Sequence, residues 1–243
     1  MRFSTIRRVE RTESTNDDIA KILGEKKSRG LTLVADYQTH GAGRKGRSWI
    51  APPGSALLFT TALPDPLAPR ELWLVPFWIG FAVHGALQNL GIATQLQWPN
   101  DVLLDARKVA GILCISRVTG DEAWAACGVG VNVSRPGDGE AMRDVIPLPA
   151  FLSDVRDIDR GTLLDEILRC ADASYGMLRE PRIMSRAWET AAHIPGTRYR
   201  LQLDSTHEFI EGEALALGES GELIVAADGT TRAIAQADAR VLR

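Results

Sequence analysis

The character of the sequence changes at Ile194-Pro195-Gly196, and this change limits the possible folds more than any other feature. Before it, apolar runs of strand length alternate with longer, helix-like segments. After it, short segments alternate in hydropathy and are separated by turns at 218–221 and 228–229. We therefore expect two units, residues 1–193 and residues 194–243. So small a β unit buries too little surface to be stable alone, and it is expected to pack on the larger unit.

The larger unit is predicted to be α+β, with a mixed sheet flanked by helices. Its strand-like runs lie at 3–10, 31–37, 55–63, 95–104, 108–116 and 123–133. Helices are expected at about 14–26, 67–90, 162–178 and 185–192. The C-terminal unit is predicted to be a small β-barrel.

Charge and composition exclude several classes of protein. A formal charge of −3 over 243 residues argues against general attraction to nucleic acid or to an anionic membrane. The most apolar stretch, 72–87, is shorter than the ~20 residues of a spanning helix and contains Pro76 and His84. Three scattered cysteines and an N-terminus without an apolar core indicate a cytoplasmic protein.

A glycine-rich segment at 41–53, called here the glycine loop, holds three cations and no acid. Glycines let backbone N–H groups approach an anion, and arginines hold phosphate or carboxylate oxygens with forked hydrogen bonds. Trp49 follows Arg47 by two residues and could cover a flat ligand. A solvated surface loop with incidental charge would have the same composition, and the segment carries no Walker or GxGxxG pattern.

Trp98-Pro99-Asn100-Asp101 and the later run 108–112 form the second constellation. Lys108 begins a strand and is followed by small apolar residues, so its charge is expected near the sheet. Such a lysine suits a reaction in which an α-phosphate accumulates charge. Asn100 and Asp101 could hold a nucleotide or its magnesium. A plain turn and a lysine at a hairpin edge explain the same residues structurally.

Two shorter motifs complete the set. Ser14-Thr15-Asn16 precedes a helix-like segment and is expected to cap it, although the same hydroxyls could bind a ureido or amide group. Asn132 is a lone polar residue at the end of the apolar run 123–133. It could cap the end of the strand, or it could bind a ligand.

In their order and spacing, these motifs closely resemble the biotin protein ligase family. The resemblance runs from about residue 10 to 135, and the C-terminal unit resembles that family's SH3-like domain. It implies a catalytic domain of the class II synthetase-like, lipoate-ligase-like fold. Relatives with a DNA-binding segment carry about 60 residues before the Ser-Thr-Asn motif, which here begins at Ser14. We therefore expect the form without that segment, with no DNA partner.

The resemblance implies a two-step reaction. The carboxylate of biotin attacks the α-phosphate of Mg-ATP, which gives biotinyl-5′-adenylate and pyrophosphate. The ε-amine of a lysine on a biotin carboxyl carrier domain of a carboxylase then displaces AMP. Biotin, ATP and Mg²⁺ are thus the implied ligands, no membrane partner is implied, and the resemblance leaves a homodimer open.

By the same resemblance, Lys108 and Arg44 are the expected catalytic cations, and Asp101 is the candidate metal ligand. The residues expected to bind biotin are Ser14, Thr15, Asn16, Gln38, Gly41, Gly43, Arg44, Lys108 and Gly111. Those expected around ATP are Arg44, Arg47, Trp49, Asn100, Lys108 and Asn132.

This chain departs from the family pattern at two positions. Ala42 stands where the family usually has an arginine, and Gln97 where it usually has a lysine. The alternatives are a lipoate or octanoate ligase or transferase of the same fold, and a non-catalytic biotin-binding relative. Ser14, Thr15 and Gln38, together with the arginine-rich glycine loop, favour biotin over a straight aliphatic acid, which has no ureido ring to hydrogen-bond.

Overall fold

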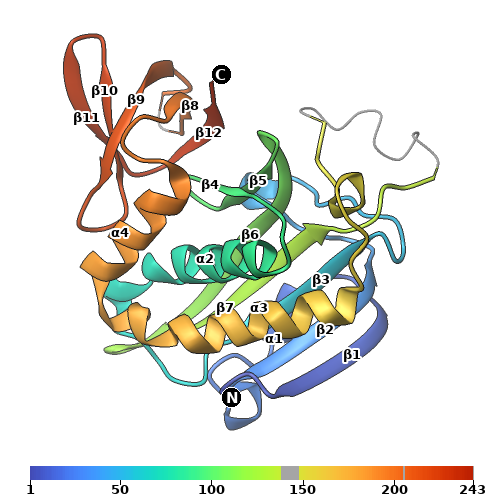
Figure 1. Cartoon of the computed structure of the whole chain (residues 1–243). Coiled ribbons are helices and arrows are strands. Elements are labelled where there is room, and N and C mark those ends of the chain that lie inside the picture. The colour runs from blue at the N-terminus through green and yellow to red at the C-terminus, as the bar shows by residue number, and fades with distance from the viewer. Residues whose placement is uncertain (138–147, 205, 243) are drawn as a thin grey trace.

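The structure is a computed structural model that describes residues 1–137, 148–204 and 206–242 (Figure 1). Its larger sheet is mixed and has the strand order β1-β2-β3-β7-β6-β5-β4. Only the pair β1–β2 is parallel among its described strands. The strands are β1 (Thr5–Thr12), β2 (Leu31–Gln38), β3 (Ala56–Ala62), β4 (Gln95–Gln97), β5 (Asp101–Leu104), β6 (Arg107–Thr119) and β7 (Glu122–Asn132).

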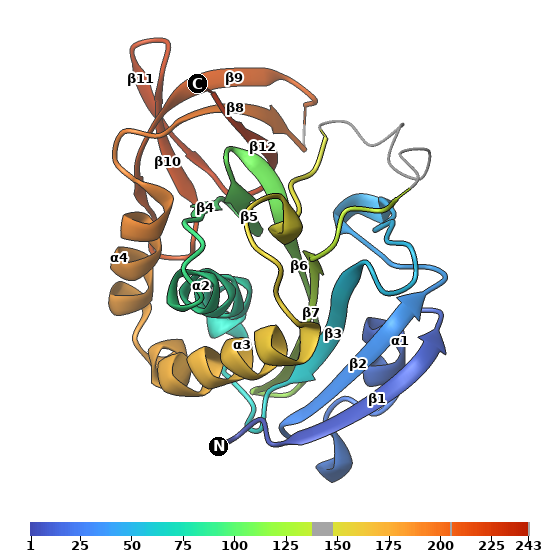
Figure 2. The ribbon, with the colours of Figure 1, turned by 45° about the vertical axis from the view of Figure 1, so that its right-hand side comes forward.

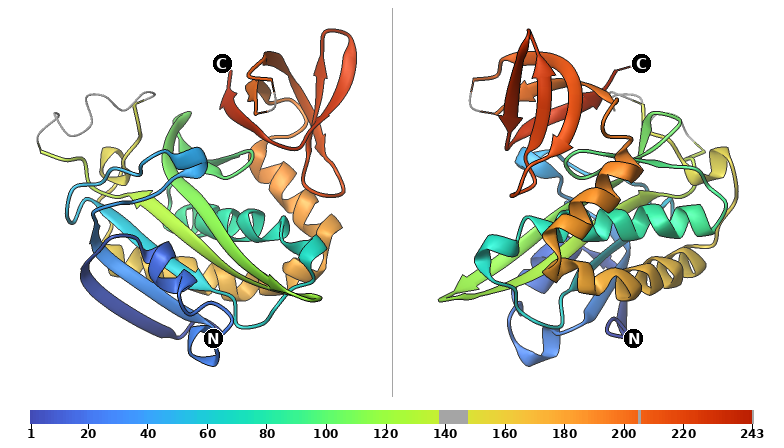
Figure 3. Two further views of the ribbon diagram at one scale, coloured as in Figure 1. Left: turned by 180° about the vertical axis from the view of Figure 1, so that it is seen from behind. Right: turned by 60° about the vertical axis from the view of Figure 1, so that its left-hand side comes forward.

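Helices cover both faces of this sheet unequally. The helices α2 (Leu74–Asn89) and α3 (Arg160–Ser174) lie on one face with α4 (Pro181–Ala192) beside them, and α1 (Thr15–Ala20) lies on the other (Figures 1 and 3). The helix α2 carries apolar residues on all of its sides, as expected for a helix buried between a sheet and other helices. Short 3₁₀ turns lie at Lys26–Ser28, Arg44–Gly46, Pro69–Glu71, Leu152–Asp154 and Tyr175–Arg179. No helix in the described ranges is both long and apolar enough to span a bilayer.

The C-terminal barrel, residues 198–241, is a five-stranded antiparallel sheet with the order β11-β10-β9-β8-β12. Its strands are β8 (Arg198–Leu203), β9 (Phe209–Leu217), β10 (Leu223–Ala227), β11 (Thr230–Ile234) and β12 (Ala237–Val241). Alternate residues of β9 are buried, which matches the alternation in the sequence. The predicted boundary between the two units falls between α4 and β8. Residues 138–147 and 243, which belong to the predicted units, lie outside the described residues.

One hydrophobic core joins the two sheets. It contains residues of the large sheet and of α2, α3 and α4, and it continues to Tyr199 and Leu201 of the barrel. Trp98 is central to this contact because it is buried and its Nε1 donates to the carbonyl of Gly221, 2.9 Å away. Its backbone N–H also donates to the hydroxyl of Tyr199 at 3.3 Å.

Three predicted elements differ from the structure. The strand predicted at 95–104 is wrong, because the chain reverses at 98–100 and forms the antiparallel hairpin β4–β5. Pro99 lies at that turn, where it has no N–H to give to a strand ladder. The first helix ends at Ala20 instead of near residue 26, and the second begins at Leu74 after a 3₁₀ turn. The strand β12 was not predicted, because its alanines and charged residues lack the hydropathy of a strand.

Candidate active site

The sequence motifs meet in one cavity of about 890 Å³. The start of α1, the glycine loop, β3 and β5–β7 form its walls, and the C-terminal barrel closes one side. The predicted site residues that line it are Ser14, Thr15, Asn16, Gln38, Gly43, Arg44, Arg47, Trp49, Asn100, Asp101, Lys108, Gly111 and Asn132. Gly41 lies behind this wall, where an added Cβ would approach the carbonyl oxygen of Trp49 to 2.6 Å.

Neutral polar groups form one end of the cavity. The backbone N–H and the hydroxyl of Thr15 both donate to Oε1 of Gln38, at 2.7 and 2.8 Å. The hydroxyl of Thr60, on β3, lies 2.8 Å from both Thr15 Oγ1 and Asn16 Oδ1. These bonds fix the two threonines and the glutamine in place, and they leave the Nε2 amide hydrogens of Gln38 available to a ligand carbonyl.

The start of α1 also has the structural role that the sequence predicts. Ser14 is its N-cap and accepts a 3.4 Å hydrogen bond from the N–H of Asp17. Asn16 is buried, and its Nδ2 donates to the carbonyl of Leu113 on β6 at 3.0 Å. The Asn16 amide therefore ties α1 to the sheet and lies directly under Gly128.

Two facing glycines form the floor of the cavity. Gly111 on β6 and Gly130 on β7 are partners in the sheet register, and the indole of Trp49 lies over both. An added Cβ would come within 2.9 Å of that ring at Gly111 and within 2.5 Å at Gly130. The indole Nε1 is buried and has no hydrogen-bond partner among the described residues, so it is an available donor inside the cavity.

Lys108 reaches the cavity through an irregularity in the sheet. The register between β5 and β6 shifts after Val102, so that Lys108 pairs with Leu103. Such a bulge turns a side chain away from its regular direction. The Nζ of Lys108 lies 2.7 Å from Oδ1 of Asp101 and 5.5 Å from the centre of the Trp49 ring. The lysine charge is therefore already inside the site, neutralised by one carboxylate.

The arginine of the glycine loop and two asparagines lie beside this pair. Arg44 donates to Oδ1 of Asn100 at 3.0 Å, and Asn100 donates through Nδ2 to the carbonyl of Ile112 at 2.7 Å. Asn132 is buried, and its Nδ2 donates to the carbonyl of Ala150 at 3.1 Å. Both amides thus anchor the backbone around the cavity, and the side-chain oxygen of Asn132 stays unused by these bonds.

The glycine loop is held against the C-terminal barrel. It folds back on itself, with the N–H of Trp49 donating to the carbonyl of Gly41 at 2.7 Å. Lys45 forms ion pairs with Asp204 and Asp238, and Arg47 lies 2.7 Å from Oδ1 of Asp238. Burial raises the pKa of Asp238, but the hydrogen bond from Lys45 and the charge of Arg47 outweigh it and hold this pKa below the usual aspartate value.

Sequence reasoning missed the residues that come from β3 and from the barrel. Thr60 has a signal in the sequence, because Thr60 and Thr61 are polar residues within an otherwise apolar run. The barrel residues have none, since nothing local marks Asp238 as the partner of Arg47, 191 positions earlier.

Asp101 is the only residue of the predicted site with a carboxylate, and it fits a magnesium ion that ATP brings with it. Mg²⁺ is commonly held by one or two carboxylates together with substrate phosphates, so a single aspartate is sufficient. Among the described residues, no group of three or more histidine, cysteine or acidic side chains could hold a metal by itself.

Cations and neutral hydrogen-bonding groups thus surround a glycine floor, as in an enzyme that binds a small acid beside a phosphate-bearing substrate. Residues 8–132, about half of the chain, match the Biotin/lipoate A/B protein ligase family. The bifunctional ligase/repressor BirA of Escherichia coli is 30% identical over an alignment of 225 positions, gaps included, that covers 89% of this chain and 68% of that protein. The chain therefore belongs to the biotin/lipoate A/B protein ligase family.

Two further relatives cover nearly the whole chain. The biotin–[acetyl-CoA-carboxylase] ligase of Mycobacterium tuberculosis is 29% identical over an alignment of 244 positions, gaps included, that covers 97% of this chain and 88% of that protein. The solved structure of the Aquifex aeolicus biotin protein ligase with biotin and ATP has a TM-score of 0.79 and 25% identity, over 99% of this chain and 100% of that one. The predicted fold, a ligase-type mixed sheet with an SH3-like C-terminal unit, is confirmed.

Proposed function

We propose that this chain activates biotin with ATP, as biotinyl-5′-adenylate, and transfers it to a lysine of a biotin carboxyl carrier domain. The observation that carries the proposal is the single cavity that joins a neutral polar end, at Thr15 and Gln38, to a cationic end, at Arg44 and Lys108. Biotin has a neutral ureido ring at one end and a carboxylate at the other. The polarity of the cavity matches that of the molecule.

The neutral end is suited to the ureido ring. The amide hydrogens of Gln38 can donate to the ureido oxygen, and the hydroxyls of Ser14 and Thr15 can accept from its N–H groups. Gly41 lets the backbone of the glycine loop approach this end, since an added Cβ there would lie 3.3 Å from Nε2 of Gln38. Gly43 lines the same cavity. The indole of Trp49 lies farther along the cavity, on the glycine floor, where it is expected to contact the nucleotide.

The cationic end addresses the main barrier of the first step, in which two anions must meet. The carboxylate of biotin forms a bond to the α-phosphorus of ATP, and the bond to pyrophosphate breaks. Lys108 can exchange its contact with Asp101 for the α-phosphate, where negative charge increases during the reaction. Arg44 holds the loop side of the same phosphate, and Arg47, Asn100 and Asn132 surround the nucleotide.

Magnesium supplies charge neutralisation for the phosphates when it is bound, and Asp101 is the residue that would hold it. The ion pair between Lys108 and Asp101 would then separate. The carboxylate of Asp101 would bind the metal, and the ammonium of Lys108 would bind the α-phosphate. Both groups keep a counter-charge in each state, so neither is left buried and unpaired.

In the second step the ε-amine of the acceptor lysine attacks the acyl carbonyl, and AMP leaves. The glycine loop is expected to cover the adenylate until then, which excludes the water that would hydrolyse it. We place the reaction in the cytoplasm, because three scattered cysteines are too few for the disulfide framework of a secreted protein.

The test is release of pyrophosphate from ATP and magnesium on addition of biotin, followed by transfer of the label to a purified carrier domain. Competition with lipoate and octanoate belongs in the same assay, since the family includes lipoate ligases. Preference for either acid over biotin would replace this proposal with the alternative of the same fold. Biotin binding without pyrophosphate release would make the chain a non-catalytic binder.

A further inference from the structure

The C-terminal barrel presents a polar face to the cavity. In β8 and β12 the register pairs Arg200 with Arg240 and Gln202 with Asp238. The neighbours of Arg200 on β8, Tyr199 and Leu201, are fully buried. Because side chains alternate along a strand, the four paired side chains just named lie on the opposite, outer face of the barrel. All four line the cavity. The barrel is therefore part of the wall of the site as well as a neighbour of it.

A side chain of the large sheet holds β12 in this position. Gln97 is buried, its Nε2 donates to the carbonyl of Ala239 at 3.0 Å, and its Oε1 accepts from the N–H of Val241 at 3.1 Å. Both β4 and β12 are edge strands of their sheets, and they lie beside each other in Figure 2. Gln97 thus binds the open edge of β12 as a neighbouring strand would, on both sides of Arg240.

The pairing of Arg200 with Arg240 is unfavourable by itself, because like charges directly opposite each other on a sheet repel. Arg200 is partly compensated by Glu211, with 3.7 Å between Nε and Oε1, and its guanidinium lies 4.6 Å from the centre of the Phe209 ring. Arg240 has no ion-pair or hydrogen-bond partner in the described part of the chain.

Arg240 differs in this respect from the other cations that line the cavity. Lys108 is paired with Asp101, Arg47 with Asp238, and Arg44 with the amide of Asn100. The barrel therefore places the guanidinium groups of Arg200 and Arg240 side by side at the cavity. The neighbouring acidic groups do not fully neutralise their positive charge. This arrangement becomes favourable when an anion with several charges lies between them.

We propose that Arg200 and Arg240 form the subsite for the terminal phosphates of ATP, which leave as pyrophosphate. The inference rests on the proposed function and deepens it, since Lys108 and Arg44 serve the α-phosphate and the barrel pair serves the two phosphates beyond it. Two forked guanidinium groups match the several oxygens of a diphosphate. The pair also supplies two cations to a site in which positions 42 and 97 carry neutral side chains.

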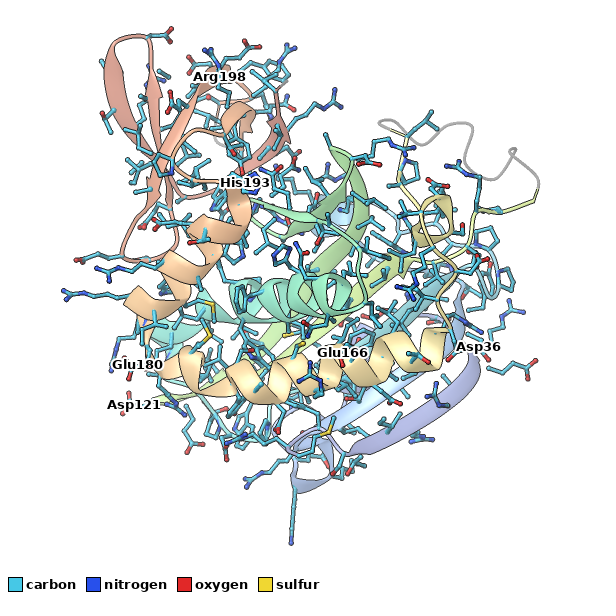
Figure 4. The ribbon with its side chains drawn as sticks, in the orientation of Figure 1. Asp36, Asp121, Glu166, Glu180, His193 and Arg198 are labelled. Carbon is cyan, nitrogen blue, oxygen red and sulfur yellow. The ribbon has the colours of Figure 1, made fainter. Side chains whose placement is uncertain are left out.

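The test compares Arg200→Gln and Arg240→Gln with a matched control, Arg198→Gln. Arg198 lies on the same face of β8, two residues from Arg200, but outside the cavity lining; Figure 4 labels it in the barrel. Each site variant should raise the KM for ATP by about 3–10-fold and leave the KM for biotin unchanged. Arg240→Lys should lose less ATP affinity than Arg240→Gln but not match the original chain, because it keeps the charge and loses the forked geometry.

A second measurement needs no turnover. Calorimetric binding of inorganic pyrophosphate with magnesium should weaken by a similar factor in both site variants, and binding of AMP, which lacks the terminal phosphates, should not change. The proposal is overturned if pyrophosphate does not bind the original chain, or if both site variants bind it as Arg198→Gln does. It is also overturned if AMP and pyrophosphate binding weaken equally. Since binding is measured directly, a failure of the ligase proposal would appear separately, as absent pyrophosphate release in every variant.

Discussion

Replacing Gly128 with alanine is expected to disturb the neutral end of the cavity through Asn16. An added Cβ would lie 2.4 Å from Oδ1, 2.7 Å from Nδ2 and 2.8 Å from Cγ of this asparagine, so its whole amide must move. The amide then loses its hydrogen bonds with Thr60 and with the carbonyl of Leu113. The backbone torsions at Gly128 suit alanine, because Gly128 is not among the glycines with positive φ.

The magnitude follows from these two bonds. Each buried hydrogen bond that is lost without replacement costs about 1–2 kcal/mol, and the gain in unfolded-state entropy from Gly→Ala offsets roughly 0.5 kcal/mol. We expect a loss of about 2–3 kcal/mol in the free energy of unfolding. For a chain of this size that lowers Tm by roughly 5–10 °C. Thr15, next to Asn16, should shift as well, so biotin affinity should fall too.

A double-mutant cycle separates this mechanism from a general loss of packing. Asn16→Ala removes the obstructing amide, so Gly128→Ala added to it should cost little more than Asn16→Ala alone. Thermal unfolding and biotin calorimetry on the two single variants and the double variant measure the coupling. Additive losses, or a Gly128→Ala variant within 0.5 kcal/mol of the original chain, would show that the close approach is relieved in another way.

Three further outcomes are expected. Lys108→Ala should lower adenylate synthesis by about 100-fold or more, and near-normal turnover would assign the reaction to another group. The fold should persist because the lysine side chain is partly exposed, but Tm should fall, since the buried Oδ1 of Asp101 loses its counter-charge. Gln97→Met should lower the free energy of unfolding by about 2 kcal/mol and raise the KM for ATP, since it leaves the edge of β12 unpaired. An unchanged Tm would show that the two hydrogen bonds from Gln97 to β12 do not hold the barrel in place. Because the folded-state pKa of Asp238 is depressed, its ion pairs stabilise the fold above the unfolded pKa near ~3.9 and are lost as the pH falls through the lower folded value. Asp238→Asn should therefore lower Tm more at pH 7 than at pH 3, and an equal effect at both values would contradict this.

The sequence predicted the parts of the fold that local patterns determine. The buried strands β2, β3 and β7 and the helix α2 have runs of apolar residues long enough to recognise, and the order of the motifs indicated the family. The hairpin β4–β5 was predicted as one strand, although Pro99-Asn100-Asp101 between its two short strands also fits a turn. The register shift that directs Lys108 into the cavity has no local signal at all.

The site was predictable where one motif supplies a side chain and unpredictable where two distant segments meet. Lys108, Arg44 and Gln38 line the cavity as expected. Nothing in the sequence indicated that Gln97 would bind β12, because the partners are more than 140 positions apart. From the sequence, the neutral side chain of Gln97 indicated the loss of a cation. In the structure, Gln97 binds β12, the strand that carries Arg240 to the site.

The central claim is that one cavity performs both the activation and the transfer of biotin. The most direct measurement is the appearance of labelled biotin on the lysine of a purified carrier domain, with ATP and magnesium present, for the original chain and for Lys108→Ala. We expect stoichiometric labelling by the original chain, dependent on ATP and accompanied by release of pyrophosphate and AMP, and labelling at least about 100-fold slower by the variant. Labelling without ATP, or no labelling of any carrier together with no pyrophosphate release, would contradict it.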